Sequence, residues 1–154
     1  MCDLLNEIYH EIYQDSFSYD NFNKRKMLQK AIYLLENMGV CVGEYSFIWD
    51  KYGPYSFSLD CDAQDLRESA LQSPMFSSFA KVRIEQIREY ANLEEGYNSA
   101  DWMECIASLH YLKYVFRIED SDLLNELKRR KSRFTNDMAN KKALCIVQEM
   151  FNLC

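Results

Sequence analysis

Apolar residues recur at three- and four-residue steps in seven stretches of the chain, and this period is typical of amphipathic helices. The strongest stripe consists of Met27, Leu28, Ala31, Ile32, Leu35 and Met38. Only 4 glycines and 2 prolines occur in 154 residues, so few positions favour the tight turns of a sheet-rich fold. The sequence therefore predicts helices joined by short connections.

Six further helical stretches flank this one along the chain. We expect them at residues 4–13, 59–70, 76–91, 99–116, 121–130 and 135–151; the apolar face of the stretch at 99–116 consists of Trp102, Ile106, Leu109, Leu112 and Phe116. Asn23 is a candidate N-cap for the helix of Met27, Gly39 is suited to follow its last residue, and Ser73-Pro74 is expected to end the helix at 59–70. The prediction is a mainly α fold: a single-domain bundle of six or seven helices over residues 1–154.

The period changes to two in the segment Tyr45-Ser46-Phe47-Ile48-Trp49-Asp50, which would place its aromatic rings on one face of a strand. The sequence Tyr52-Gly53-Pro54-Tyr55 then predicts a turn, because Pro54 restricts its own φ and disfavours the α region at Gly53. We expect a short β-hairpin or extended wing near residues 40–57, with residues 40–42 as a candidate partner strand.

Charge and cysteine content limit the class of protein. The net charge is −6 and the pI is about 5.0, which argues against a basic nucleic-acid-binding coat. No apolar run approaches the ~18 residues needed to span a bilayer, and no export signal is evident at the start. The six cysteines form no C-x-x-C pair, and most lie on predicted apolar faces. We therefore expect free thiols in a cytoplasmic protein that does not bind a membrane.

Catalytic and metal-binding patterns are weak throughout the chain. Cys105 and His110 would point in directions about 140° apart on a helix, which does not suit a nucleophile and its base. Asp60, Asp62 and Asp65 resemble the start of a calcium loop, but Asp65 replaces the turn glycine and Leu71 replaces the bidentate glutamate. An acidic first helical turn explains Asp60 and Asp62 better.

The remaining patterns are no stronger. Glu126-Leu127-Lys128 matches only part of a nuclease motif and lies in a helical stripe, and no glycine-rich phosphate-binding loop occurs. The sequence therefore predicts no catalytic residue, no metal ligand and no cofactor.

Two basic clusters have alternative explanations. The first contains Lys128, Arg129, Arg130, Lys131 and Arg133, which could contact nucleic acid or an acidic protein surface. The same cations could also form a solvated helix end, where they would complement the helix dipole. The second cluster, Lys24-Arg25-Lys26, is expected to point into water, since cations oppose the dipole in a first turn.

The predicted wing is the strongest candidate for a binding surface, because Trp49, Tyr52, Tyr55 and Phe57 surround the rigid Gly53-Pro54 turn. Tyrosine and tryptophan are common anchors of protein interfaces, but the rings could equally form a small core between the wing and the bundle. Both functions are compatible if Trp49 points inward and Tyr55 outward. The candidate partner-binding residues are Trp49, Tyr52, Gly53, Pro54 and Tyr55.

The helix at 27–35 and the wing together resemble a signature of the Panacea domain superfamily. The matching residues are Met27-Leu28-Gln29-Lys30-Ala31-Ile32-Tyr33-Leu34-Leu35 and then Phe47-x-Trp49-x-x-Tyr52-Gly53-Pro54-Tyr55-Ser56. The order of elements is similar over about residues 22–152, and the match is closer to the YwgA-like phage-associated proteins than to the SocA-like antitoxins. Lys51 and Met27 depart from the usual pattern.

The resemblance implies a small, mostly helical domain without catalytic residues that acts by binding a protein. The expected partner is a toxin or a subunit of a phage-defence complex, so the expected role is that of an antitoxin or accessory regulator. The alternative is a winged helical nucleic-acid-binding protein that uses the basic stretch 128–133.

Overall fold

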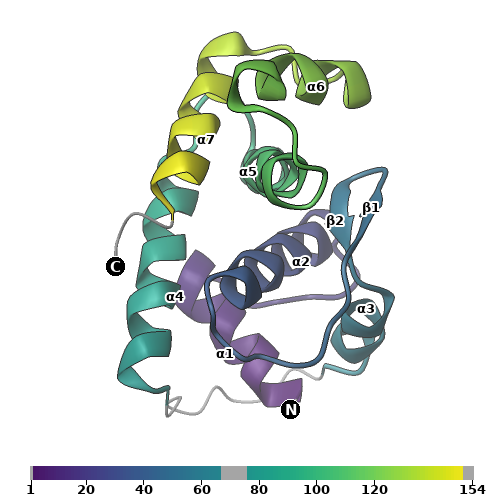
Figure 1. The fold of residues 1–154 in the computed structure, drawn as a ribbon. Helices are drawn as coiled ribbons and strands as arrows, with labels where there is room; N and C mark the ends of the chain where they lie inside the picture. The colour runs from purple at the N-terminus through teal and green to yellow at the C-terminus, as the bar shows by residue number, and fades with distance from the viewer. Residues whose placement is uncertain (1, 67–75, 151–154) are drawn as a thin grey trace.

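The computed structural model describes residues 2–66 and 76–150, and over these ranges it contains seven α-helices and a two-stranded antiparallel sheet (Figure 1). The helices are α1 (Cys2–Tyr13), α2 (Phe22–Asn37), α3 (Phe57–Gln64), α4 (Ser78–Asn92), α5 (Ser99–Tyr114), α6 (Leu123–Arg130) and α7 (Asp137–Glu149), and a 3-10 turn (Asp120–Asp122) precedes α6. The strands are β1 (Ile48–Asp50) and β2 (Gly53–Tyr55). The predicted mainly α fold with a short hairpin is confirmed.

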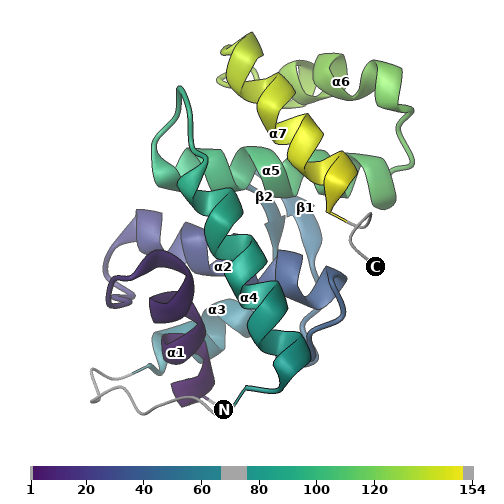
Figure 2. The ribbon, with the colours of Figure 1, turned by 90° about the vertical axis from the view of Figure 1, so that its left-hand side faces the viewer.

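Helix α5 lies at the centre of the molecule and organises the packing. In Figures 1 and 2, α6 and α7 lie on one side of α5, and α2 and the hairpin lie on the other. Every residue from Trp102 to Leu112 is buried, so α5 has no solvated face. The predicted apolar face is confirmed for Trp102, Ile106, Leu109 and Leu112, which are all fully buried. Its extension to Phe116 was wrong, because α5 ends at Tyr114 and Phe116 is partly exposed. The sequence did not predict that the other faces of α5 are also buried by neighbouring elements.

Helix α2 packs across α5 and buries an almost continuous stretch from Leu28 to Leu35. Its N-cap is Asn21, whose side chain accepts a hydrogen bond from the Lys24 backbone at 3.1 Å, and not Asn23 as the sequence suggested. The helix therefore begins one turn earlier than its apolar stripe. After its end, Gly39 adopts a φ of +92°, which confirms the expected glycine after the last residue.

The hairpin is shorter than expected and uses a different partner strand. β1 pairs with β2 in the register Ile48↔Tyr55, Trp49↔Pro54 and Asp50↔Gly53. Residues 40–42 do not pair with β1; instead Val40 and Val42 are buried in an irregular segment. Pro54 is tolerated because a two-stranded sheet has only edge strands, where a missing N–H donor has little cost.

Other differences from the sequence predictions concern the end of helix α3 and the exposure of the cysteine thiols. α3 ends at Gln64, before Leu66, and Asp60 but not Asp62 lies in its first turn; Ala70 and Ser73-Pro74 lie outside the described residues. Cys41, Cys61 and Cys145 are exposed free thiols and only Cys105 is buried, so the placement of most cysteines on apolar faces was wrong for the described ones.

Candidate partner-binding cleft at the hairpin

The register of the hairpin separates its side chains into two faces, because directly paired residues of antiparallel strands point to the same side. Trp49 and Pro54 share the face toward α5, where the Trp49 ring lies 5.6 Å from the rings of both Tyr111 and Phe116. Tyr55 and Ile48 share the opposite face. Both Trp49 and Tyr55 are half-buried, and the Tyr55 hydroxyl donates to Asp60 at 2.7 Å.

Two polar side chains of α2 hold β2 against the bundle. The Gln29 amide donates to the Ser56 carbonyl and accepts from the Ser56 N–H, both at 2.9 Å, and the Lys30 ammonium donates to the Pro54 carbonyl at 2.7 Å. Gly53 is required by the same approach: its φ is +89°, and a Cβ atom there would lie 2.6 Å from Ser108 Oγ on α5. The hairpin is thus fixed to both α2 and α5.

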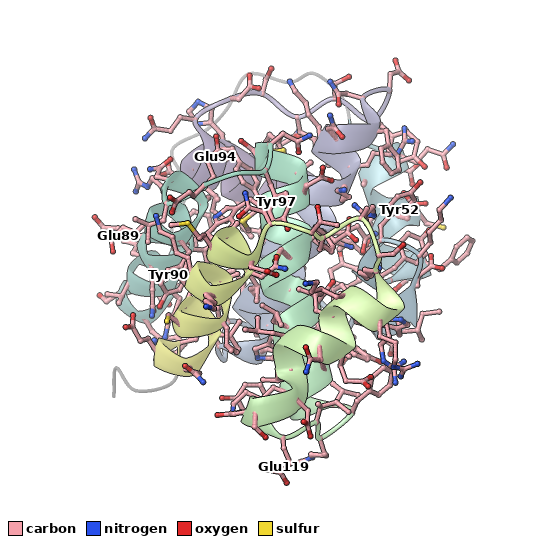
Figure 3. The ribbon with its side chains drawn as sticks, turned by 90° about the horizontal axis from the view of Figure 1, so that it is seen from above. Tyr52, Glu89, Tyr90, Glu94, Tyr97 and Glu119 are labelled. Carbon is pink, nitrogen blue, oxygen red and sulfur yellow. The ribbon has the colours of Figure 1, made fainter. Side chains whose placement is uncertain are left out.

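A cleft of about 340 Å³ opens between α2, the hairpin and the start of α3, and we call it the Tyr52 cleft. Its lining residues are Tyr19, Phe22, Arg25, Lys26, Gln29, Lys30, Asp50, Tyr52, Tyr55 and Asp60. The rings of Tyr52 and Phe22 meet edge to face at 4.9 Å. In Figure 3, Tyr52 lies on the opposite side of the molecule from Glu89 and Tyr90 of α4.

A buried ion cluster lies behind the Tyr52 cleft, with Glu104 of α5 as its centre. Glu104 accepts from Lys26 at 2.7 Å and from the Arg133 guanidinium, and the Lys131 ammonium lies 3.3 Å from it. Lys26 also pairs with Asp101 at 2.6 Å. Burial raises the pKa of Glu104, but the hydrogen bonds from Arg133 and Lys26 outweigh this effect and hold it below its usual range.

Lys30 is a buried cation with a different environment. Its side chain is almost fully buried, and burial lowers the pKa of its ammonium to about 7, although Glu104 opposes this shift. Burial likewise lowers the pKa of Lys131, which donates to the backbone carbonyls of Asp50 and Lys51 at the hairpin turn. The hairpin is therefore held by two lysines from different parts of the chain.

The predicted basic stretch does not form one cationic surface. Lys128 pairs with Asp137 at 2.9 Å, and Arg129 and Arg130 both pair with Glu126 at the exposed end of α6. Lys131 and Arg133 instead turn inward to the ion cluster. All five cations have acidic partners, so the stretch is divided between a solvated helix end and the interior.

Cys105 and His110, which the sequence analysis considered as a nucleophile and its base, each have another polar partner in the structure. The Cys105 thiol donates to the side-chain amide oxygen of Asn140 at 3.5 Å, and burial raises its pKa, which opposes formation of a thiolate. His110 is 2.7 Å from the Tyr33 hydroxyl, and burial lowers its pKa to about 4. Among residues 2–66 and 76–150, the structure contains no group of three or more His, Cys, Asp or Glu side chains suited to a metal ion.

Sequence reasoning missed the ion cluster and assigned Lys26 wrongly. Lys26 was expected to point into water, but it is 5% exposed and neutralised by Asp101 and Glu104, which outweigh the unfavourable helix dipole. A usable signal existed: Glu104 interrupts the apolar run Trp102–Leu112, and Lys30 interrupts that of α2. Charged residues are rarely buried unless they are paired, so such interruptions indicate buried partners.

Of the helices in the described ranges, none has the length and apolar character that crossing a membrane requires. No protein-family model, curated protein or solved structure matches the chain.

Proposed function

We propose that this protein is a non-catalytic interaction module that binds a partner protein through the Tyr52 cleft and the exposed face of its hairpin. The observation that carries the proposal is the cleft itself, in which aromatic and charged side chains from α2, the hairpin and α3 converge. Such amphipathic rings are typical of interface hot spots, which combine apolar contact with a polar group.

Exposed apolar side chains occur on three elements that contribute to the cleft, and they support this proposal. Phe22 is 43% exposed, Ile48 61% and Phe57 72%, and they belong to α2, β1 and α3 respectively. Phe22 both lines the cleft and remains exposed, so it is suited to contact a bound partner. The hairpin is fixed by Gln29, Lys30 and Lys131, so little ordering would be required on binding.

The resemblance to Panacea-type proteins supports a more specific role. Its signature residues Gln29 and Lys30 bind the backbone of the Pro54–Ser56 segment, which ends the second half of the same signature. We propose that the protein acts as an antitoxin or accessory regulator in a toxin–antitoxin or phage-defence locus. Its partner would be a toxin or a subunit of a defence complex.

The test is co-purification of the chain with the products of neighbouring genes, followed by binding titrations. Phe22→Ala in the cleft should weaken any complex at least tenfold. Phe79→Ala is the matched control, because Phe79 is 48% exposed on α4 and does not line the Tyr52 cleft. Absence of a stable complex with any of these products would contradict the proposal, as would equal losses in the two variants.

Tyr55 and Trp49 provide a second test of the two hairpin faces. We expect Tyr55→Ala to weaken partner binding by about 2 kcal/mol, the usual size of an aromatic hot spot, with little loss of stability. Trp49→Ala should lower the free energy of unfolding by at least about 2 kcal/mol. The loss should stay below the ~3–5 kcal/mol of a fully buried ring, because Trp49 is only half-buried. Thermal melts and titrations measure both; a loss of stability without loss of affinity for Tyr55→Ala would assign the rings to a small core.

The alternative proposal, a winged nucleic-acid-binding protein, has less support. Its anchor would be Lys128–Arg133, yet these cations are engaged by Glu126, Asp137, Glu104 and Asp101. Each phosphate contact would contribute about −0.9 to the log–log salt slope on B-DNA, so steeply salt-dependent binding to DNA would favour this alternative.

A further inference from the structure

Positive charge gathers around the Tyr52 cleft, although the chain as a whole carries −6. The cleft is lined by Arg25, Lys26 and Lys30. The Tyr52 ring has Lys26, Lys51 and Arg133 as cationic neighbours. The ion cluster behind the cleft adds Lys131. The acids in the same region are Asp50, Asp60, Asp101 and Glu104. With all groups ionised, six cations against four acids give this region a local charge of +2.

Most of the acids are already occupied by groups of the protein itself. Asp60 accepts from Tyr55, and Asp101 and Glu104 accept from Lys26 and Arg133. The Tyr52 ring has the cationic groups of Lys26, Lys51 and Arg133 at 5.3–5.4 Å, so a further cation would be repelled there. The cleft is therefore better suited to an anion.

Lys30 is the second observation that points to an anion. Its side chain lines the cleft and is 1% exposed, and the hydrogen bond that the structure describes for its ammonium goes to a neutral acceptor, the Pro54 carbonyl. An ammonium has three donors, and a buried cation is costly without a compensating negative charge.

We infer that the Tyr52 cleft receives a carboxylate side chain from an acidic segment of the partner protein. This inference rests on the proposed function and specifies the chemistry of its partner. Lys30 and Arg25 bind the carboxylate, while Phe22 and Tyr52 contact an apolar side chain next to it. A carboxylate is favoured over nucleic acid because a net charge of −6 repels a long polyanion but not a single acidic side chain in a locally positive cleft.

Binding should weaken as the pH rises from 7 to 9, since only the ammonium form of Lys30 attracts a carboxylate. The pKa of Lys30 is lowered to about 7 by burial, and the charged groups that act on it are Lys26 on α2, Asp50 on β1, Glu104 on α5 and Lys131 after α6. A bound carboxylate would raise this pKa and cause proton uptake.

The first experiment uses small probes that differ only in charge. ¹⁵N-labelled protein is titrated with 3-phenylpropionate, 3-phenylpropanamide and 3-phenylpropylammonium, and amide signals are followed by NMR. We expect only the carboxylate to shift the signals of residues 19–30 and 50–60, and more strongly at pH 6.5 than at pH 9. Equal shifts from the amide, larger shifts from the ammonium, or shifts confined to other residues would overturn the inference.

Variants locate the charge that is responsible. Lys30→Met and Arg25→Gln should each weaken 3-phenylpropionate binding at least fivefold, whereas Lys113→Met, which removes a lysine paired with Asp120 at the end of α5, should leave it unchanged. Arg25→Gln keeps the test valid if Lys30→Met fails to fold. Unchanged binding of 3-phenylpropionate in both Arg25→Gln and a folded Lys30→Met would overturn the inference.

The partner complex separates this inference from the proposed function. If a partner binds, we expect Glu→Gln and Asp→Asn changes in the segment that contacts the cleft to weaken the complex at least tenfold. A complex that depends on Phe22 but not on any partner carboxylate overturns the inference and keeps the proposed function. Binding of single-stranded DNA at the cleft in place of protein overturns both.

Discussion

Lys30 shows how one buried charge links stability, the hairpin and the cleft. Between pH 7 and its usual pKa of 10.5, Lys30 holds fewer protons in the folded protein than in the unfolded chain. The free energy of unfolding therefore rises with pH across this window. As the pH falls toward 7, the buried amine becomes protonated and the folded protein loses this stability.

We predict that Lys30→Met changes this pH dependence. The free energy of unfolding of the variant should exceed that of the wild type most at pH 6, and this difference should decline steadily toward pH 9. The reason is that the cost of burying the wild-type ammonium decreases as the amine loses its proton. Urea unfolding at pH 6, 7, 8 and 9 measures this difference. Lys113→Met is the control, and a difference that does not vary with pH would show that Lys30 keeps an ordinary pKa.

At the scale of elements, polar side chains decide where helices begin and how the hairpin is attached. Asn21 caps α2, Ser56 caps α3 with a 3.2 Å hydrogen bond from the Leu59 N–H, and Asn98 caps α5. Ser56 has two roles, since its backbone also pairs with Gln29. The hairpin and α3 are thus positioned from α2 as one unit.

We predict that Asn21→Ala lowers the free energy of unfolding by about 1 kcal/mol, because the Lys24 N–H loses its acceptor. Asn23→Ala should change it by no more than a few tenths, since Asn23 is exposed within the first turn of α2. Chemical denaturation of both variants distinguishes the two asparagines. An equal or larger loss for Asn23→Ala would return the cap to the position that the apolar stripe suggested.

On the scale of the whole molecule, Glu104 joins three parts that are distant in sequence. It connects Lys26 of α2, its own helix α5, and Lys131 and Arg133 after α6. The described residues otherwise pack about one apolar core, so the ion cluster is the polar counterpart that fixes how α6 and the hairpin meet α5.

We predict that Glu104→Gln lowers the free energy of unfolding by about 3–5 kcal/mol, because it leaves buried cations without their counter-charge. Glu126→Gln should have a much smaller effect, since Glu126 pairs with Arg129 and Arg130 at the surface. Thermal and urea unfolding compare the two. A small loss for Glu104→Gln would mean that Asp101 alone neutralises the cluster.

Acid unfolding provides a second readout of the same group. The folded-state pKa of Glu104 is lowered below its usual 4.5, so its contribution to stability is present above pH 4.5 and is lost as the pH falls through the folded-state value. In Glu104→Gln this acid-dependent loss should be smaller than in the wild type.

The sequence determined the helices, the hairpin and the aromatic candidates, because these depend on short-range patterns. The period of Met27 to Met38 and the scarcity of glycine and proline predict a helical bundle, and the alternation from Tyr45 to Asp50 predicts an extended segment. Three predictions were wrong where the pattern was ambiguous: the N-cap of α2 is Asn21 rather than Asn23, α5 ends before Phe116, and β1 does not pair with residues 40–42. Each of these features depends on a contact rather than on a period.

The packing of the helices, and not any local pattern, places the buried charges next to one another and brings together the residues of the Tyr52 cleft. Lys26, Glu104 and Arg133 are far apart in the chain, and helical periodicity contains no information on which charges will meet. Arg129 and Lys131 are two residues apart in one basic stretch, yet Arg129 pairs at the surface whereas Lys131 is buried against Glu104. The physical reason is that the cost of burying a charge depends on its counter-charge, and only the packing of α2, the hairpin and α6 around α5 determines where that counter-charge lies.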